Sequence, residues 1–419
     1  MTSYLAATRD RFLLGLKYAD FRTMWIATTC SGAAAWALIV ARGWLAWEIT
    51  GESTWVGIIT FAAMFPRVFS TPIVGYLADR FDRQTMLRWI FALNLAHNIL
   101  LGFLVMNDLA GPWVLMVLAL FNGTLRAGQM TTAQALIPNL VPREHLLNAL
   151  ALNQATQQGS RLVGPLAILP LLGFLSLDAA FWFCSVFYLI GFVQVSRVGT
   201  RSTGRIDASR SFWGNFIAGF EYIYTHPHLL AVVLLAVAHC SLTMSYEAIL
   251  PAISEDKLGA GSVGVSYLMG GVGTGALISS IFLAGIRGPS VRGKIFLVFA
   301  LLSAAAPILL ALSTMREISI LATVLIGATQ AGFMTISHTA IQSLTDDSVR
   351  GRVAGVYSVH VGGSMAITNM LGAIVADIFT AQAVMAVGGL LFLAVVVLSL
   401  GSGTVRRVYF PAPAVPAAA

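Results

Sequence analysis

Long apolar runs alternate with short hydrophilic steps along this chain, and that pattern constrains its fold more than any other feature. Only 10% of the 419 residues are charged, whereas a soluble domain carries about 25%. A helix needs roughly 20 apolar residues to cross a bilayer, and lipid offers backbone groups no hydrogen-bond partner. The pattern therefore excludes a soluble protein and predicts an all-α integral membrane protein.

Twelve of the runs are long enough to cross a bilayer as helices. We predict spans over 22–47, 55–78, 85–106, 112–136, 148–172, 177–196, 228–253, 262–285, 293–313, 318–342, 352–376 and 382–402. The hydrophilic segment 197–211 separates six spans from six. We therefore expect a six-helix bundle over 1–196, a cytoplasmic linker and lead-in helix over 197–227, a second six-helix bundle over 228–405 and a disordered tail over 406–419. No cleavable signal peptide is expected, because the first apolar run follows a charged stretch and is too long.

The positive charges are distributed asymmetrically between the loops. Of 25 Lys and Arg residues, we place 19 in the two tails and the even-numbered loops. Cytoplasmic loops of membrane proteins carry this excess, so both termini are predicted to be cytoplasmic. The net charge of +7 is therefore interpreted as a topology signal, and no nucleic-acid partner is expected.

An internal repeat supports the division into two halves. A shift of 204 residues aligns Gly123, Ala127, Gly128, Met130 and Thr131 with Gly327, Ala331, Gly332, Met334 and Thr335. The same register also aligns Gly159 and Ser160 with Gly363 and Ser364. Two parallel repeats related by an axis along the membrane normal are typical of transporters built from two similar bundles.

The charged step from Gly75 to Gln84 reads GYLADRFDRQ. It resembles the loop between the second and third helices of major facilitator transporters. The resemblance implies that Gly75, Asp79, Arg80 and Arg83 form a latch that holds the two halves together when the cytoplasmic side is shut. Asp82 stands where the family usually has a second glycine. The alternative interpretation is an ordinary basic cytoplasmic loop.

Two more segments narrow the resemblance. The segment from Trp44 to Gly51, WLAWEITG, is similar to the enterobactin-exporter and macrolide-efflux branch of that superfamily. The segment from Arg161 to Pro165, RLVGP, resembles the Gly-Pro element of facilitator antiporters, in which Gly164 and Pro165 would pack helices together. Ser160 and Leu166–Ile168 depart from the further glycines usual there. The resemblance implies the major facilitator fold, two pseudo-symmetric six-helix bundles in the bacterial cytoplasmic membrane.

Helical spacing sorts the polar residues of the spans into stripes. These stripes are Asn122, Arg126 and Gln129; Asn153, Gln157 and Arg161; His239, Thr243 and Glu247; and Gln330, His338 and Gln342. Charge inside a membrane usually faces a water-filled pathway or a partner. We therefore place Arg42, Arg126, Arg161, Gln157, Asn122 and Gln330 on a substrate pathway. The alternatives are that Arg126 bonds helix carbonyls and that Arg161 contributes to helix packing beside Gly164 and Pro165. Arg42 could instead form an extracellular gate or snorkel to the interface, and Arg67 could snorkel as well. Asn94, His97 and Asn98 have no explanation in this pattern.

Proton coupling needs a group that gains and loses charge as it faces each side. Glu247 is the leading candidate because it is the one acid placed well within a span, and a structural partner for an arginine is the alternative. His239, His338 and His360 are further candidates, since histidine titrates near physiological pH. Each could instead form a hydrogen bond between helices. No metal site is predicted from the histidines or from the three separate cysteines.

These residues predict a secondary active transporter and not an enzyme, since no nucleophile, metal or cofactor signature is present. If Arg42, Arg126 and Arg161 all reach the cavity, the site is positive and favours an anionic or amphipathic cargo. The resemblance implies proton-coupled export of a siderophore- or drug-type molecule, with a proton gradient in place of a cofactor. We expect a monomer whose partners are its substrate and membrane lipid. Lysophospholipid movement, solute uptake and a non-transporting membrane sensor remain as alternatives.

Overall fold

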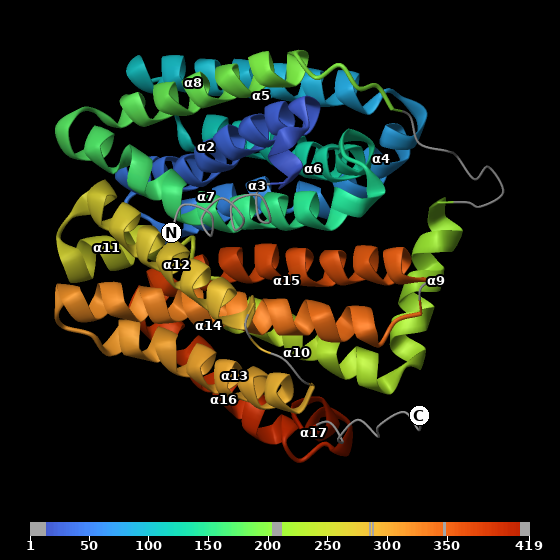
Figure 1. The fold of residues 1–419 in the computed structure, drawn as a ribbon. Helices are drawn as coiled ribbons and strands as arrows, with labels where there is room; N and C mark the ends of the chain where they lie inside the picture. The colour runs from blue at the N-terminus through green and yellow to red at the C-terminus, as the bar shows by residue number, and fades with distance from the viewer. Residues whose placement is uncertain (1–13, 203–211, 285, 287–288, 347–348, 411–419) are drawn as a thin grey trace, which may run out of the picture. The chain divides into compact units, whose positions relative to one another are not determined.

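A computed structural model describes residues 14–202, 212–284, 286, 289–346 and 349–410 (Figure 1). Within these residues the chain is helical and forms no β-strand. The first half contains α2 (Ala19–Thr50), α3 (Ser53–Met64), α4 (Pro66–Arg80), α5 (Arg83–Met106), α6 (Pro112–Leu140), α7 (Leu146–Phe174) and α8 (Leu177–Ser196). The second half contains α9 (Phe212–Thr225), α10 (Pro227–Thr243), α11 (Leu250–Leu258), α12 (Gly261–Ala284), α13 (Pro289–Leu312), α14 (Arg316–Ser343), α15 (Arg350–Ile378), α16 (Ala381–Ser399) and α17 (Gly403–Tyr409).

The predicted spans coincide with these helices. Each of the twelve overlaps one helix or a consecutive pair. In the described part of the chain, eight helices are long and apolar enough to cross a membrane, or up to nine if α9 and α10, bent by 105°, count as one span. Helices α6 and α7 are each 29 residues long but are not among the eight. Both carry the polar stripes that were predicted for the pathway.

The chain divides into two compact units. The N-terminal unit contains residues 1–50 and 62–207, and the C-terminal unit contains residues 51–61 and 208–419. The short segment 51–61 belongs to the C-terminal unit because α3 is bonded to α15. The carboxylate of Asp377 accepts hydrogen bonds from the backbone N–H groups of Ser53 and Thr54, at 2.8 and 2.6 Å. Carboxylates stabilise helix N-termini in this way, because the first N–H groups have no partner within the helix.

The internal repeat appears as matching helix contacts inside each unit. Gly123 on α6 presses against the backbone of Ala63 at the end of α3, and Gly327 on α14 presses against the backbone of Val272 on α12. Five residues further on, Gly128 and Gly332 meet side chains of α5 and α13, respectively. A side chain at Gly123 or Gly327 would collide with a neighbouring carbonyl. The aligned glycines therefore mark the same close approach between helices in both halves.

The helix of the second predicted span breaks at Phe65. Helix α3 ends at Met64 and α4 begins at Pro66. Proline lacks an N–H donor and its ring clashes with the carbonyl four residues earlier, so it interrupts a helix but is tolerated as the first residue of the next one. The predicted span over 55–78 was continuous, and the local proline explains the difference.

The seventh predicted span also breaks, and side chains distant in the sequence form hydrogen bonds with backbone groups at the break. Helix α10 ends at Thr243 and α11 begins at Leu250. Gln330 of α14 donates to the carbonyl of Thr243 at 2.8 Å, and Asn369 of α15 accepts from the N–H of Ala248 at 3.3 Å. Neighbouring side chains commonly satisfy backbone groups that a helix break exposes within a membrane.

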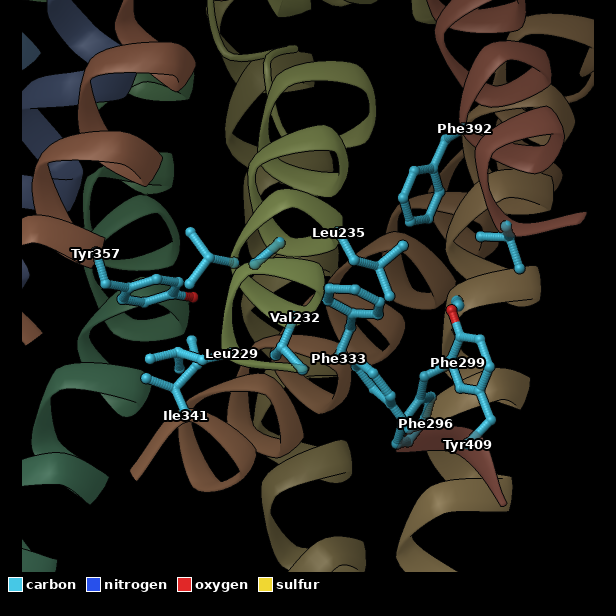
Figure 2. Close-up of a cluster of buried hydrophobic side chains, with 14 of the residues drawn as sticks. Leu229, Val232, Leu235, Phe296, Phe299, Phe333, Ile341, Tyr357, Phe392 and Tyr409 are labelled. Atoms are coloured by element: carbon cyan, nitrogen blue, oxygen red, sulfur yellow. The ribbon is translucent and has the colours of Figure 1, made fainter. Parts of the chain in front are cut away.

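The core of the C-terminal unit is rich in aromatic side chains (Figure 2). Phe296 and Phe299 of α13 lie near Phe333 of α14, and Tyr409 of α17 lies beside Phe296 with ring centroids 5.5 Å apart. Tyr409 is fully buried. The expectation of disorder from residue 406 is therefore wrong for residues 406–409, because α17 brings this apolar ring into the core. Residues 411–419 lie outside the described part, as does 203–211 of the predicted linker.

Candidate functional site

A cavity of about 240 Å³ lies inside the N-terminal unit and is lined by α2, α4, α6, α7 and α8. We call it the N-terminal cavity. Its polar lining side chains are Thr28, Ser31, Arg67, Arg126, Gln129, Gln134, Asn153, Gln154, Thr156, Gln157, Ser160 and Arg161. Three of these are arginines, and no aspartate or glutamate is among the described residues that line it. The lining therefore carries positive charge without a lining acid.

Two of the arginines share one aromatic ring. The guanidinium carbon of Arg161 lies 4.7 Å from the ring centroid of Trp36, and that of Arg126 lies 5.4 Å from it. A tryptophan face attracts cations because of its negative quadrupole. The ring thus holds the two guanidinium groups beside the cavity. Since like charges repel, a bound anion would relieve the repulsion between them.

Close packing of α2 on α7 fixes the position of this ring. Gly164 of α7 lies against the backbone of Ala33 and Ala37 and the Cβ of Trp36. Gly32 of α2 lies against Ser160 in the same way. Small residues let two membrane helices approach closely. The Gly-Pro element therefore sits where α7 meets α2, and it brings Arg161 over Trp36.

Arg67, for which snorkelling to the interface was an alternative interpretation, lines the N-terminal cavity. It follows Pro66, the first residue of α4, and one guanidinium nitrogen lies 3.5 Å from the Sδ of Met130. The helix break places this side chain one residue into a new helix. The direction of the Arg67 side chain therefore could not be predicted from the helical periodicity of a continuous span.

Gln129 connects the cavity to α2. Its Nε2 donates to the Oγ of Ser31 at 2.6 Å, while its Oε1 has no hydrogen-bond partner among the described residues. Beside it, the indole N–H of Trp25 donates to Thr156 at 2.7 Å. Gln129 and Asn153 belonged to the predicted polar stripes but were not chosen as site residues. Their place in these stripes was the sequence signal that could have identified them as site residues.

Arg42 and Asn122 are not among the residues that line the N-terminal cavity. They lie instead in a buried polar chain that joins α2, α6 and α5. A guanidinium nitrogen of Arg42 lies 3.5 Å from the Oδ1 of Asn122, whose Nδ2 donates to the Oδ1 of Asn94 at 3.1 Å. Asn94 and Asn98 in turn donate to backbone carbonyls of α5. This network accounts for the two asparagines of the third predicted span that the sequence pattern left unexplained.

In the C-terminal unit, the predicted polar residues lie in two settings. His239 is fully buried, its Nε2 lies 2.8 Å from the Oγ of Ser303, and its ring stacks on Phe333 at 4.0 Å. This environment fits the alternative of a hydrogen bond between helices. Gln330 is also buried, and it holds the break after α10 through Thr243 and the hydroxyl of Tyr246.

Glu247 lies inside that break and not on a helix. The expected stripe of His239, Thr243 and Glu247 on one helix face is therefore wrong at its last member, because α10 ends at Thr243. The Glu247 side chain is 8% exposed.

The two other histidine candidates each lie beside a tyrosine. His338 meets the ring of Tyr357 edge-on at 5.0 Å, and His360 lies 3.2 Å from the hydroxyl of Tyr224.

The predicted latch lies at the ends of α4 and α5. Arg83 donates to the carbonyls of Ala78 and Ala135 at 3.1 and 3.0 Å, and so bonds the last turns of α4 and α6. Asp82 caps α5 by accepting from the N–H of Thr85 at 2.9 Å, and it also accepts from the N–H of Ser202 at 3.0 Å. The guanidinium of Arg80 lies over the ring of Tyr76. Gly75 and Asp79 are helical in α4, but the side-chain position of Asp79 lies outside what the structure describes. A role for these residues between the two halves stays a prediction.

Two solved transporter structures share this arrangement of helices. The nucleoside transporter NupG covers 90% of this chain and 99% of its own, at 12% identity and a TM-score of 0.73. A POT family transporter in complex with 5-aminolevulinic acid covers 94% and 96%, at 13% identity and a TM-score of 0.71. At such identities the likeness shows the fold alone, which is that of a major facilitator transporter.

Sequence relatives and a family model agree with that class. The macrolide efflux protein A of Streptococcus pyogenes is 23% identical over 267 residues, covering 63% of this chain and 65% of the relative. The chain thus spans slightly less than two thirds of that relative's length. The enterobactin exporter EntS of Escherichia coli O127:H6 is 24% identical over 351 residues, covering 80% and 81%. The model of the family described as transmembrane secretion effector matches residues 13–406. The chain belongs to this major facilitator family, and it is a multi-pass membrane protein whose relatives include an efflux protein and an exporter.

Proposed function

We propose that the protein exports an amphipathic organic anion, of siderophore or drug type, by proton-coupled alternating access. The N-terminal cavity carries this proposal, because three arginines line it. Positive charge within low-dielectric walls concentrates anions. The export direction is supported by the efflux and exporter relatives. The protein would act in the bacterial cytoplasmic membrane as a monomer, with both termini in the cytoplasm.

The size of the cavity supports an amphipathic cargo. Sites for drug-sized molecules usually enclose about 300–1,000 Å³, whereas this cavity encloses about 240 Å³. It would therefore take the anionic portion of a larger molecule. The aromatic ring of Trp36 and the phenol of Tyr188 contribute the flat surfaces on which that portion can rest.

Proton coupling is assigned to Glu247. This carboxylate lies in the non-helical segment between α10 and α11, where backbone groups are held by side chains of α14 and α15. A carboxylate in such a segment can gain and lose a proton as the segment moves. No cofactor is needed, because the proton gradient supplies the driving force.

The cargo is found by comparing metabolite secretion and drug susceptibility between cells with and without the protein. We expect at least one amphipathic anion to reach the medium only when the protein is present. A set of exclusively neutral or cationic exported compounds, or net uptake, would contradict the proposal.

The coupling is tested with that cargo in proteoliposomes. An imposed pH gradient should drive transport by the natural protein, and Glu247→Gln should reduce the pH-driven component to background while cargo exchange without a gradient continues. Glu255→Gln, on α11 and exposed, is the matched control. If Glu247→Gln left pH-driven transport intact, the carrier assignment would be wrong.

A further inference from the structure

Two buried polar atoms of opposite hydrogen-bonding type belong to residues that line the N-terminal cavity. The Nε of Arg161 is a donor, and the Oε1 of Gln129 is an acceptor. Neither has a hydrogen-bond partner in the described part of the protein. Buried polar atoms in folded proteins are hydrogen-bonded in about 90% of cases or more. At this cavity the two atoms leave one donor and one acceptor for a ligand to satisfy.

The orientation of the Gln129 amide follows from its neighbours. The hydroxyl of Ser31 donates to the carbonyl of Thr28 at 3.2 Å, so its oxygen is left to accept. The group 2.6 Å from that oxygen is accordingly assigned as the NH₂ of Gln129. Oxygen and nitrogen of an amide are distinguished by such networks. The remaining Oε1 is consequently an acceptor, on a side chain that is only 9% exposed.

The two atoms make different demands on a ligand. The guanidinium of Arg161 is always charged and offers donors only, so it requires an acceptor and prefers an anionic one. Arg126 beside the same Trp36 ring adds to that preference. Gln129 Oε1 requires a donor. A plain carboxylate satisfies the arginine but presents only lone pairs to Gln129, whereas a hydroxyl group on the same molecule can donate to it.

We propose that the N-terminal cavity selects hydroxyl-bearing carboxylates, with the carboxylate held by Arg161 and the hydroxyl donating to Gln129. This inference rests on the proposed function, since it assigns the cavity to the cargo. It adds that the exported anion carries a hydrogen-bond donor close to its charge.

Small aromatic acids test the inference without knowledge of the cargo. The probes are 3-hydroxybenzoate, 3-methoxybenzoate, benzoate and benzamide, titrated calorimetrically into the full-length protein in lipid nanodiscs. The meta position prevents the hydroxyl from bonding its own carboxylate. We expect 3-hydroxybenzoate to bind about tenfold more tightly than 3-methoxybenzoate. The hydroxyl of the first can donate to the buried Oε1 of Gln129, whereas the methoxy group of the second has no donor and would leave that oxygen without a hydrogen bond.

Variants assign the preference to one residue. Gln129→Leu should reduce the hydroxy-to-methoxy ratio of affinities to about one while benzoate still binds. Gln342→Leu, the same substitution at an exposed position of α14, should leave the ratio near ten. A ratio that survives in Gln129→Leu would overturn the assignment.

The remaining outcomes separate this inference from the proposed function. Equal binding of 3-hydroxybenzoate and 3-methoxybenzoate, both tighter than benzamide, would overturn the hydroxyl preference and leave anion export standing. Benzamide binding as tightly as benzoate would overturn the anionic cargo and the inference together. Absence of saturable binding by any probe to folded protein would likewise overturn both.

Discussion

The two halves of this transporter carry different chemistry at the same positions of their internal repeat. In the N-terminal half these positions hold Arg126, Gln129, Asn153 and Arg161, and in the C-terminal half they hold Gln330, Phe333, Tyr357 and Met365. Gly123 and Gly128, which set helix spacing, are matched by Gly327 and Gly332. Packing at these glycines has thus been kept, while the charged side chains at the four compared positions lie in one half.

The C-terminal side chains at these positions have structural partners. Gln330, which corresponds to Arg126, donates to the carbonyl exposed where α10 ends. Phe333, which corresponds to Gln129, stacks on His239. We infer that the N-terminal half binds the anionic cargo, whereas the C-terminal half stabilises the break between α10 and α11 in which Glu247 lies.

Removing the charge of the N-terminal half has the largest expected effect on transport. The double variant Arg126→Met with Arg161→Met should lower the initial rate of cargo export about 100-fold, since hydrogen bonds to charged groups contribute about 1.5–3 kcal/mol each. The rate is measured in proteoliposomes containing equal amounts of protein. Arg316→Met is the matched control, because Arg316 also lies over an aromatic ring, 5.1 Å from Tyr267, but in the other half. Equal losses in the two variants would abolish the distinction between the halves.

A change in the C-terminal half should affect stability more than binding. Gln330→Leu leaves the carbonyl of Thr243 without its side-chain donor, at a cost of about 1–3 kcal/mol. We expect the thermal unfolding midpoint to fall by at least about 2 °C, with little change in benzoate affinity. Gln342→Leu, on an exposed part of the same helix, should leave the midpoint within about 1 °C. A large loss of anion binding in Gln330→Leu would show that the C-terminal half also contacts the cargo.

The smallest expected effect concerns α3, whose residues 53–61 are grouped with the C-terminal unit although α3 precedes α4 in the chain. Asp377→Ala removes the carboxylate that caps α3, and loss of such a cap costs about 0.5–2 kcal/mol. Hydrogen exchange at the amides of Ser53 and Thr54 should therefore accelerate by about 2- to 30-fold. Asp256→Ala, which removes an exposed carboxylate bonded to Gln382, is the control. Unchanged exchange at Ser53 and Thr54 would mean that α3 is held by packing alone.

Much of the helical architecture was predictable because it depends on local sequence. An apolar run of sufficient length defines a span without reference to its neighbours, and the predicted runs coincide with helices for that reason. The break at Pro66 was also visible locally but was not used. The break after Thr243 was not, since it depends on Gln330 and Asn369, which lie far along the chain. Similarly, burial of Tyr409 depends on α13, so composition alone suggested a disordered tail.

The candidate site was predictable only in part. The stripe spacing placed Arg126, Gln157 and Arg161 on one pathway, and these three residues line the same cavity. It also grouped Arg42 and Asn122 with them, although these two residues bond to each other and to α5 outside the cavity lining. Helical phase gives the face on which a side chain lies, but it does not show whether that face meets a cavity or another polar helix.

The central claim, that the N-terminal half presents an anion-selective cavity, can be tested by cysteine modification. In a background with Cys30, Cys184 and Cys240 replaced by alanine, Gln157→Cys and its repeat counterpart Val361→Cys each react with an anionic and a cationic methanethiosulfonate of similar size. Rates are normalised to those of a free thiol. Because a positive cavity concentrates anions, the anionic-to-cationic ratio at position 157 should exceed that at position 361 by about tenfold and should fall on adding Arg161→Met. An equal or lower ratio at position 157 would contradict the claim.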